Sequence, residues 1–160
     1  MHPEDLKKKI INLALEEGFG RAGVASLDPF QSESDRLDRW FEKDYHRHLP
    51  YLDPIKLLSP KSLEASSRTA LVVFYPYARP DRIPGESGAH KASRYLWGDD
   101  YHWIIKKKLN RILEAIHEFD PTIEGKACVD TAPLLERQLA QRAGIGWQGK
   151  NTLLIAEQDG

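Results

Sequence analysis

The sequence predicts an α+β fold, α/β-like in its order of elements, in which a single mixed β-sheet is flanked by helices. Segments with apolar residues three or four positions apart, as in amphipathic helices, alternate with short apolar runs typical of strands. The alternation is loose and the links are short, which argues against a doubly wound nucleotide-binding fold. At 160 residues, the chain is long enough for one domain with a real hydrophobic core.

The first predicted elements are a helix, a strand and a second helix. The helix over residues 3–17 carries a stripe of apolar side chains and ends at two glycines. Residues 21–26 are predicted to form a short strand, and the next helix starts at Ser32 or Ser34. A Ser-Pro pair then predicts a short helix over residues 59–64.

The middle of the chain holds the best strand and the strongest helix. Residues 69–75 are apolar on both faces, as in a strand at the centre of a sheet. The loop over residues 76–90 is rich in proline and glycine, and its length is typical of functional or mobile loops. The helix over residues 100–119 has an apolar face and an opposite lysine-rich face. Residues 125–130 are predicted to form the next strand.

The last part of the chain predicts a capped helix, a glycine-rich turn and a strand. Residues 133–143 have helical spacing, with Thr131 as a candidate cap and a proline in the first turn. Gly144 fits the left-handed position that ends a helix. Residues 152–156 are apolar and are predicted to be the final strand.

The turn over residues 144–151 imitates two phosphate-binding motifs. Its glycines match G-x-G-x-x-G, and with Lys150 they match the first seven positions of the P-loop. In both motifs a strand enters the glycines and a helix leaves them, whereas here the predicted order is reversed. A helix C-terminus repels anions, and Asn151 stands where the P-loop has Ser or Thr. Nucleotide binding through this turn is therefore disfavoured.

Composition excludes several classes of protein. The net charge of -1 gives no overall basic field of the kind that announces a nucleic-acid partner. The single cysteine, Cys128, excludes an internal disulfide framework and a C-x-x-C metal pair. The sequence has no apolar run long enough for a membrane span and no secretory signal, so we expect a cytoplasmic location. A turn-like composition at the end predicts that the chain is part of a longer one.

Asp130 is the main candidate for chemistry, because it lies at the end of a predicted strand and before a helix. It could act as a general acid if a bulky ligand desolvates it, or it could be an ordinary helix cap. His46 and His48 could bind a metal, but no third ligand is evident, which favours surface histidines. Cys128 is expected to be a small buried thiol. The lysine-rich face is expected to be solvated, with a phosphate contact as the alternative.

The aromatic segment over residues 93–103 has two readings. It crowds aromatic side chains and a histidine at the entry to a helix. It could be a hydrophobic staple at a helix start, or a rim of flat side chains against a flat ligand.

Four linked motifs resemble those of the epoxyqueuosine reductases, in the same order and spacing across residues 3–160. They are Arg94-Tyr95, Gly98-x-Asp100-Tyr101-His102, Val129-Asp130-Thr131-x-Pro133-Leu134-x-x-Arg137 and Ala143-Gly144-Ile145-Gly146-Trp147-x-Gly149-Lys150-Asn151.

The resemblance implies that residues 1–160 are the N-terminal cobalamin-binding domain of an oxidoreductase. That enzyme reduces the epoxide of epoxyqueuosine in tRNA, the last step of queuosine biosynthesis, with cobalamin and two [4Fe-4S] clusters. The implied partners are tRNA carrying epoxyqueuosine and an external electron donor, with no membrane partner, and we expect a monomer. Since the chain has no C-x-x-C, it cannot hold the clusters itself and is expected to be inactive alone.

The resemblance also implies roles for single residues. Asp130 matches the family's proposed proton donor and cofactor neighbour. Ser93 and Leu154 match positions that contact the corrin ring.

The remaining matches are less direct. Lys150 and Asn151 belong to the family's most recognisable motif and are expected to bind the cofactor. Leu57 falls where the family often has an arginine beside the cofactor, so one polar contact is in doubt, although Lys56 could reach the same place. The glycines of the turn are expected to let the backbone approach a planar macrocycle.

Two other functions stay open. The chain could belong to another corrinoid-dependent reductase that acts on a small molecule. It could also be a non-enzymatic remnant that binds a cofactor or a partner, a reading that the missing cysteines favour.

Overall fold

The computed structural model describes residues 2–47, 66–76, 99–130, 132 and 134–157. Its helices and strands are α1 (Pro3–Glu16), β1 (Arg21–Ser26), α2 (Gln31–Glu42), β2 (Thr69–Phe74), α4 (Tyr101–Phe119), α5 (Glu136–Arg142), β3 (Trp147–Gln148) and β4 (Leu154–Ile155). The predicted α+β class is confirmed. The predicted helix over residues 59–64 and nearly all of the loop over residues 76–90 lie outside the described residues.

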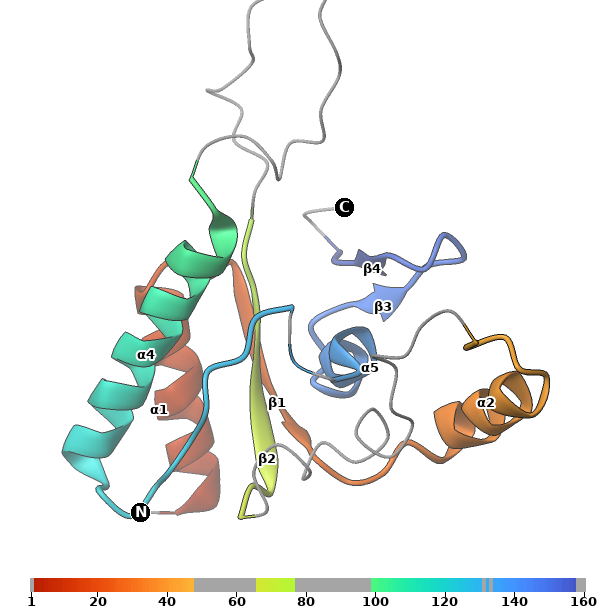
Figure 1. Ribbon diagram of the computed structural model, residues 1–160. Coiled ribbons are helices and arrows are strands. Elements are labelled where there is room, and N and C mark those ends of the chain that lie inside the picture. Colours follow the sequence, from red (N-terminus) through yellow and green to blue (C-terminus); the bar gives the residue numbers. More distant parts are fainter. Residues whose placement is uncertain (1, 48–65, 77–98, 131, 133, 158–160) are drawn as a thin grey trace, which may run out of the picture.

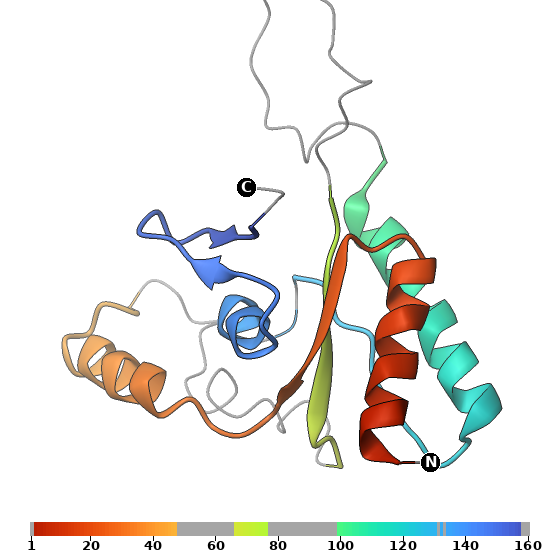
Figure 2. The ribbon, with the colours of Figure 1, turned by 180° about the vertical axis from the view of Figure 1, so that it is seen from behind.

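A two-stranded antiparallel ribbon, β1 with β2, forms the centre of the molecule. Arg21 lies opposite Phe74 and Ser26 lies opposite Thr69. Helices α1 and α4 lie side by side on one face of this β1–β2 ribbon, and α5 lies on the other face (Figures 1 and 2). An isolated two-stranded ribbon is marginal in water, so helices on both faces are what stabilise it.

Side chains of the ribbon alternate between two cores. Leu71 and Val73 pack on the cluster that α1 and α4 build around Ala14 and Ile112. Their neighbours Ala70 and Val72 pack instead on the cluster that includes Leu139 of α5. Strand β2 is apolar on both faces because each face is covered. Its predicted central position is wrong in the described part, where β2 pairs with β1 alone.

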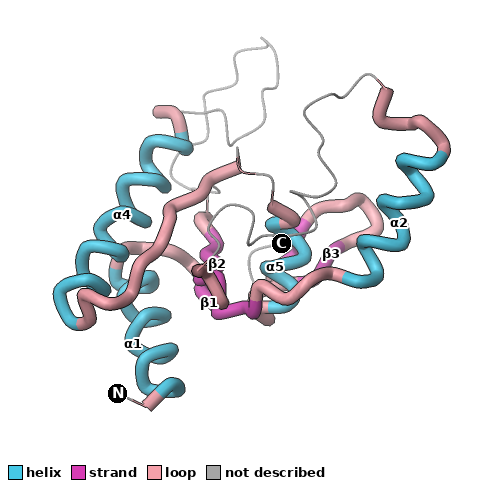
Figure 3. Tube along the Cα trace, turned by 60° about the horizontal axis from the view of Figure 1, so that its bottom comes forward, coloured by secondary structure: helices cyan, strands magenta, loops and turns pink. Residues whose placement is uncertain are grey.

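The second pair of strands forms a hairpin of its own, which corrects the prediction of one mixed sheet. In this β3–β4 hairpin (residues 147–155), Trp147 lies opposite Ile155 and Gln148 opposite Leu154. The strands of the described residues therefore form two separate antiparallel sheets. Figure 3 shows the hairpin on the same side of the ribbon as α5. The reason is local. The chain changes direction at Gly144, after α5, and β3 then packs against α5 and not against an edge of the β1–β2 ribbon.

Residues 125–130 are not a strand, contrary to the prediction. They run past α4, where a Cβ on Gly125 would lie 2.6 Å from Cδ2 of Leu113. Within the described residues, no backbone–backbone hydrogen bond joins them to β2. Alternating side chains predict an extended backbone, but a strand also needs a partner within pairing distance.

The helix ends follow the predicted signals in part. Gly18 and Gly144 have φ values of 85° and 74°, the left-handed conformation expected of glycine after a helix. Helix α5 begins three positions later than predicted, at Glu136, and Thr131, the proposed cap, lies outside the described residues. None of the described helices is both long enough and apolar enough to cross a bilayer.

Substitution of Gly23 by alanine should destabilise the fold. An added Cβ would lie 2.5 Å from the carbonyl oxygen of Ala143, so β1 and α5 would have to separate. We expect the free energy of unfolding to fall by roughly 1–3 kcal/mol, as for other overpacked sites, in a urea titration followed by circular dichroism. Gly20→Ala is the matched control, because its Cβ would meet nothing closer than 3.4 Å. Equal losses in the two variants would contradict the packing argument.

The thiol of Cys128 should react slowly. Burial raises the pKa of this half-buried side chain above its ordinary value, so less thiolate is present at a given pH. Reaction with Ellman's reagent at pH 8 should be slower than for free cysteine, and the pH–rate curve should be displaced to higher pH. The difference should vanish in urea. Since Cys128 is the single cysteine, the signal has no other source.

Candidate functional site

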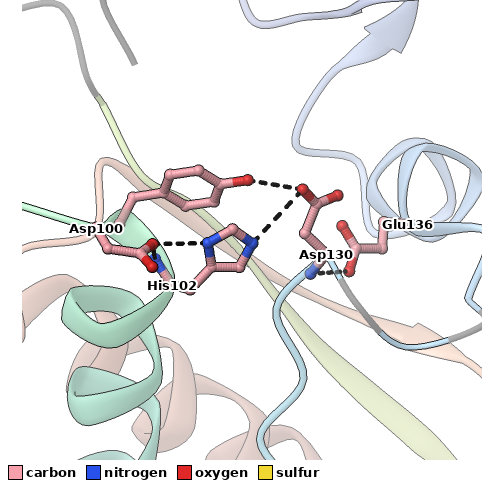
Figure 4. A network of polar contacts seen from close by, with 5 residues as sticks. Asp100, His102, Asp130 and Glu136 are labelled. Carbon is pink, nitrogen blue, oxygen red and sulfur yellow. Dashed lines mark hydrogen bonds and ion pairs between the residues drawn. The ribbon is translucent and has the colours of Figure 1, made fainter. Parts of the chain in front are cut away.

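Asp130 lies between the start of α4 and the start of α5 (Figure 4). Its φ of 53° is left-handed, a conformation that aspartate tolerates better than most residues other than glycine. Its side chain is 63% exposed. The carboxylate faces α4 and the backbone amide faces α5, so the residue is held from two directions.

The carboxylate of Asp130 meets two side chains from the first turn of α4. The hydroxyl of Tyr101 donates a hydrogen bond to Oδ2 at 2.7 Å. Nε2 of His102 lies 3.9 Å from the same oxygen, within ion-pair distance when the imidazole is protonated. The Tyr101 and His102 rings are stacked, with centroids 4.0 Å apart. An acidic group, a phenol and an imidazole are thus brought together where a proton can be held or exchanged.

Asp100 holds His102 in place from the side of the imidazole opposite Asp130. It caps α4 by accepting a hydrogen bond from the backbone amide of His102 at 2.9 Å. The same oxygen lies 2.7 Å from Nδ1 of His102. These contacts lower the pKa of Asp100 below its usual value, the backbone hydrogen bond contributing most. Asp100, His102 and Asp130 therefore form one line in which the imidazole lies between two carboxylates.

Glu136, the first residue of α5, holds the other end of Asp130. Its Oε1 accepts a hydrogen bond from the Asp130 amide at 3.0 Å. The residue as a whole is exposed, but its carboxyl group is turned toward Asp130 (Figure 4). Burial of that group raises the pKa of Glu136; the charge of Asp130 adds to the rise, and the amide hydrogen bond opposes it.

A large, mainly apolar cavity adjoins these groups. It has a volume of about 1180 Å³ and lies between β2, α4, α5 and residues 123–130. Tyr101, Asp130 and Glu136 belong to its wall, together with Leu154 of β4. A cavity of this size and lining is suited to a large apolar or planar group, with the acid at one side.

The structure brings together some of the predicted site residues and separates others. Asp130 and Leu154 line the same cavity. Lys150 and Asn151 do not line it; they lie in the turn between β3 and β4.

Asn151 has a structural role in that turn, because its Oδ1 accepts a hydrogen bond from the amide of Leu153 at 3.2 Å. Lys150 is exposed. Leu57 and Ser93, the two other predicted contacts, lie outside the described residues.

The glycine turn has a local explanation. A Cβ on Gly146 would lie 2.7 Å from the carbonyl oxygen of Ile155, and one on Gly149 would lie 2.7 Å from Cδ1 of the same residue. These glycines let the hairpin close on itself. Helix α5 precedes the turn and β4 follows it, while β3 lies within the residues predicted as turn. The predicted reversal of the phosphate-loop order, with the helix before and the strand after, is therefore confirmed.

The predicted histidine site has no metal-binding partners among the described residues. His46 packs against Trp40 and Phe41, and its predicted companion His48 lies outside the described residues. In the described ranges, no group of three or more His, Cys, Asp or Glu side chains could hold a metal ion.

The lysine-rich face of α4 is not wholly solvated. Arg111 donates to Oε2 of Glu17 at 2.6 Å, and Lys108 donates to the carbonyl of the same residue. Part of the predicted basic face therefore joins α4 to α1.

In the sequence, Tyr101 and His102 belong to the aromatic segment over residues 93–103 with no assigned partner, and Glu136 has no predicted role. The first two stand in the Gly-x-Asp-Tyr-His motif, so their spacing was visible but their partner was not. Glu136 follows Asp130 by six positions, and no periodicity connects them. In the structure, Asp130 has a left-handed backbone and its amide donates to Glu136.

Comparisons with known proteins agree with one another. Residues 58–131 match the family described as "Epoxyqueuosine reductase QueG, DUF1730". The chain is 32% identical over 161 residues to an epoxyqueuosine reductase of Cyclobacterium marinum, covering 99% of this chain and 51% of that protein. It is 33% identical to one of Leadbetterella byssophila, with 98% and 52% covered. The chain thus spans about half the length of these curated relatives.

Solved structures of that name share the fold. The epoxyqueuosine reductase of Streptococcus thermophilus has a TM-score of 0.84 and 29% identity, with 98% of this chain and 43% of that chain covered. A reductase with an epoxyqueuosine-modified tRNA-Tyr stem loop has a TM-score of 0.73 and 28% identity, with 96% and 42% covered. In a Bacillus subtilis structure (TM-score 0.77, 26% identity, 96% and 41% covered), a catalytic loop named for an aspartate is swung out of the active site.

By its sequence motifs, its matched relatives and its fold, this chain is similar over almost its whole length to the epoxyqueuosine reductases, and it corresponds to about half of each matched relative.

Proposed function

We propose that this chain is the cobalamin-binding part of an epoxyqueuosine reductase and that Asp130 is its proton donor. The observation that carries the proposal is the position of Asp130, beside Tyr101 and His102 in the wall of a large apolar cavity. The similarity to epoxyqueuosine reductases over almost the whole chain supports the same activity.

The residues present suit a large planar cofactor. The cavity is mainly apolar, it is wider than a drug-sized ligand needs, and Leu154 is part of its wall. When bound, cobalamin would supply the reducing metal centre. Leu154 would contact the corrin ring. Lys150 and Asn151 of the neighbouring turn would also bind the cofactor, a role that only their sequence motif supports. Two [4Fe-4S] clusters would be held outside this chain, whose single cysteine cannot provide their ligands.

Asp130 would provide acid catalysis. Reduction of an epoxide to an alkene takes up two electrons and two protons and releases water. An alkoxide is a poor leaving group, so a proton delivered to the ring oxygen lowers the barrier. The exposed carboxylate would lose water when substrate covers it, and desolvation raises the proton affinity of a carboxylate. Tyr101 and His102 are then positioned to hold the carboxyl group in place and exchange its proton.

The substrate would be tRNA that carries epoxyqueuosine. A similar structure contains such a tRNA stem loop, and another has a catalytic loop named for an aspartate, which supports assigning that role to Asp130. An external electron donor, a monomeric state and a cytoplasmic location, where tRNA is modified, complete the proposal.

Cobalamin binding can be tested on the 160-residue chain itself. Hydroxocobalamin should change its visible absorption spectrum on titration with the chain. Leu154→Glu should weaken binding by roughly tenfold or more, because it buries a charge against the corrin ring. Lys107→Ala is the matched control, since this residue is exposed on α4 and does not line the cavity. A folded chain that leaves the spectrum unchanged would contradict the cofactor assignment.

The role of Asp130 can be tested in a chimera in which residues 1–160 replace the matched half of the Cyclobacterium marinum relative. Asp130→Asn should keep cobalamin affinity within about twofold but reduce kcat roughly 100- to 10,000-fold, the usual effect of losing a general acid. Epoxyqueuosine reduction in a tRNA stem loop is the measurement. Full turnover by Asp130→Asn would reject the assignment.

A further inference from the structure

Asp130 has a backbone conformation that needs support from its surroundings. Its φ of 53° lies in a region that residues other than glycine rarely occupy. Such conformations persist where neighbouring groups hold them, and they are frequent at functional sites. The contacts of Asp130 should therefore include one that fixes its backbone.

The contacts of Asp130 divide into two kinds. Tyr101 and His102 reach its carboxylate and fix the end of the side chain. Glu136 reaches its backbone amide, with Oε1 at 3.0 Å from the nitrogen. Among the described residues, no backbone carbonyl accepts a hydrogen bond from this amide. Glu136 thus supplies the acceptor that a neighbouring strand would supply if residues 125–130 were paired.

Glu136 is well anchored for this purpose. It begins α5, which buries Leu139 and Ala140 against the rest of the molecule. In the described part of the chain, no ion pair joins its carboxylate to a cation, although Arg137 follows it directly. Burial of the carboxyl group raises the pKa of Glu136, and the hydrogen bond from the Asp130 amide opposes that rise by favouring the carboxylate. The contact of its carboxylate with the Asp130 amide therefore distinguishes Glu136 from a glutamate that is only solvated.

We propose that Glu136 is a positioning residue for Asp130: its carboxylate holds the Asp130 amide, and so fixes the bend that aims the Asp130 carboxylate at Tyr101 and His102. The catalytic half of this statement rests on the proposed function of Asp130. The structural half rests only on the contacts within the chain.

The structural half is tested by amide hydrogen exchange of the 160-residue chain, read by NMR. Glu136→Ala should speed exchange at the Asp130 amide roughly threefold to tenfold, the range expected from one lost hydrogen bond. Glu136→Gln keeps an acceptor oxygen at the same place and should stay within about twofold of the parent chain. Gln141→Ala, an exposed position on α5, is the control for general loosening of the helix. Faster exchange in all three variants, or no change in Glu136→Ala, would overturn the proposal.

The catalytic half is tested in the chimera described above. Glu136→Ala should lower kcat roughly 10- to 100-fold, the size of a misplaced catalytic group, and leave KM within about threefold. Glu136→Gln should restore most of kcat. In an Asp130→Asn background, Glu136→Ala should cost little more, because both act on one group. Independent losses in the double variant would overturn the positioning role. If Asp130→Asn is instead fully active, the acid assignment fails, while the exchange data still decide whether Glu136 holds the bend.

Discussion

Burial of the β1–β2 ribbon on both faces is the constraint on which the rest of this structure depends. A ribbon of two strands cannot hold its shape alone, and here α1 and α4 cover one face while α5 covers the other. The ribbon separates α4 from α5, and Asp130 lies between the starts of these two helices. Tyr101 and Glu136 can therefore reach opposite ends of Asp130.

The contact between β1 and the end of α5 sets how closely these layers approach. Gly23 leaves room for the carbonyl of Ala143, and a side chain there would push α5 outward. The site depends on that distance, because Glu136 is carried by α5 and Tyr101 by α4. The close packing of β1 against α5 therefore also sets the distances between Asp130 and its partners.

Much of the local structure could be predicted from the sequence, because periodicity is a local property. Helices α1 and α4 and strands β1 and β2 lie within one or two residues of their predicted bounds. What could not be predicted depends on distant partners. Residues 125–130 have the alternation of a strand but lack a paired neighbour, and the last two strands pair with each other instead of joining β1 and β2. Of the site, the sequence located Asp130 and Leu154, which share a cavity, while their roles stay predictions. Glu136 could not be found, since no sequence periodicity marks its contact with the Asp130 amide.

The left-handed bend at Asp130 has a consequence for how mutational surveys of this position should be interpreted. Asparagine and glycine tolerate positive φ, so they remove the carboxyl group without straining the backbone. Alanine, serine or glutamate add a conformational penalty to any chemical one, and valine or isoleucine add a larger penalty. A library scored at residue 130 would therefore mix two independent effects. Sorting the variants by their tolerance of the left-handed region, before sorting them by charge, would separate the cost of folding the loop from the cost of losing the proton.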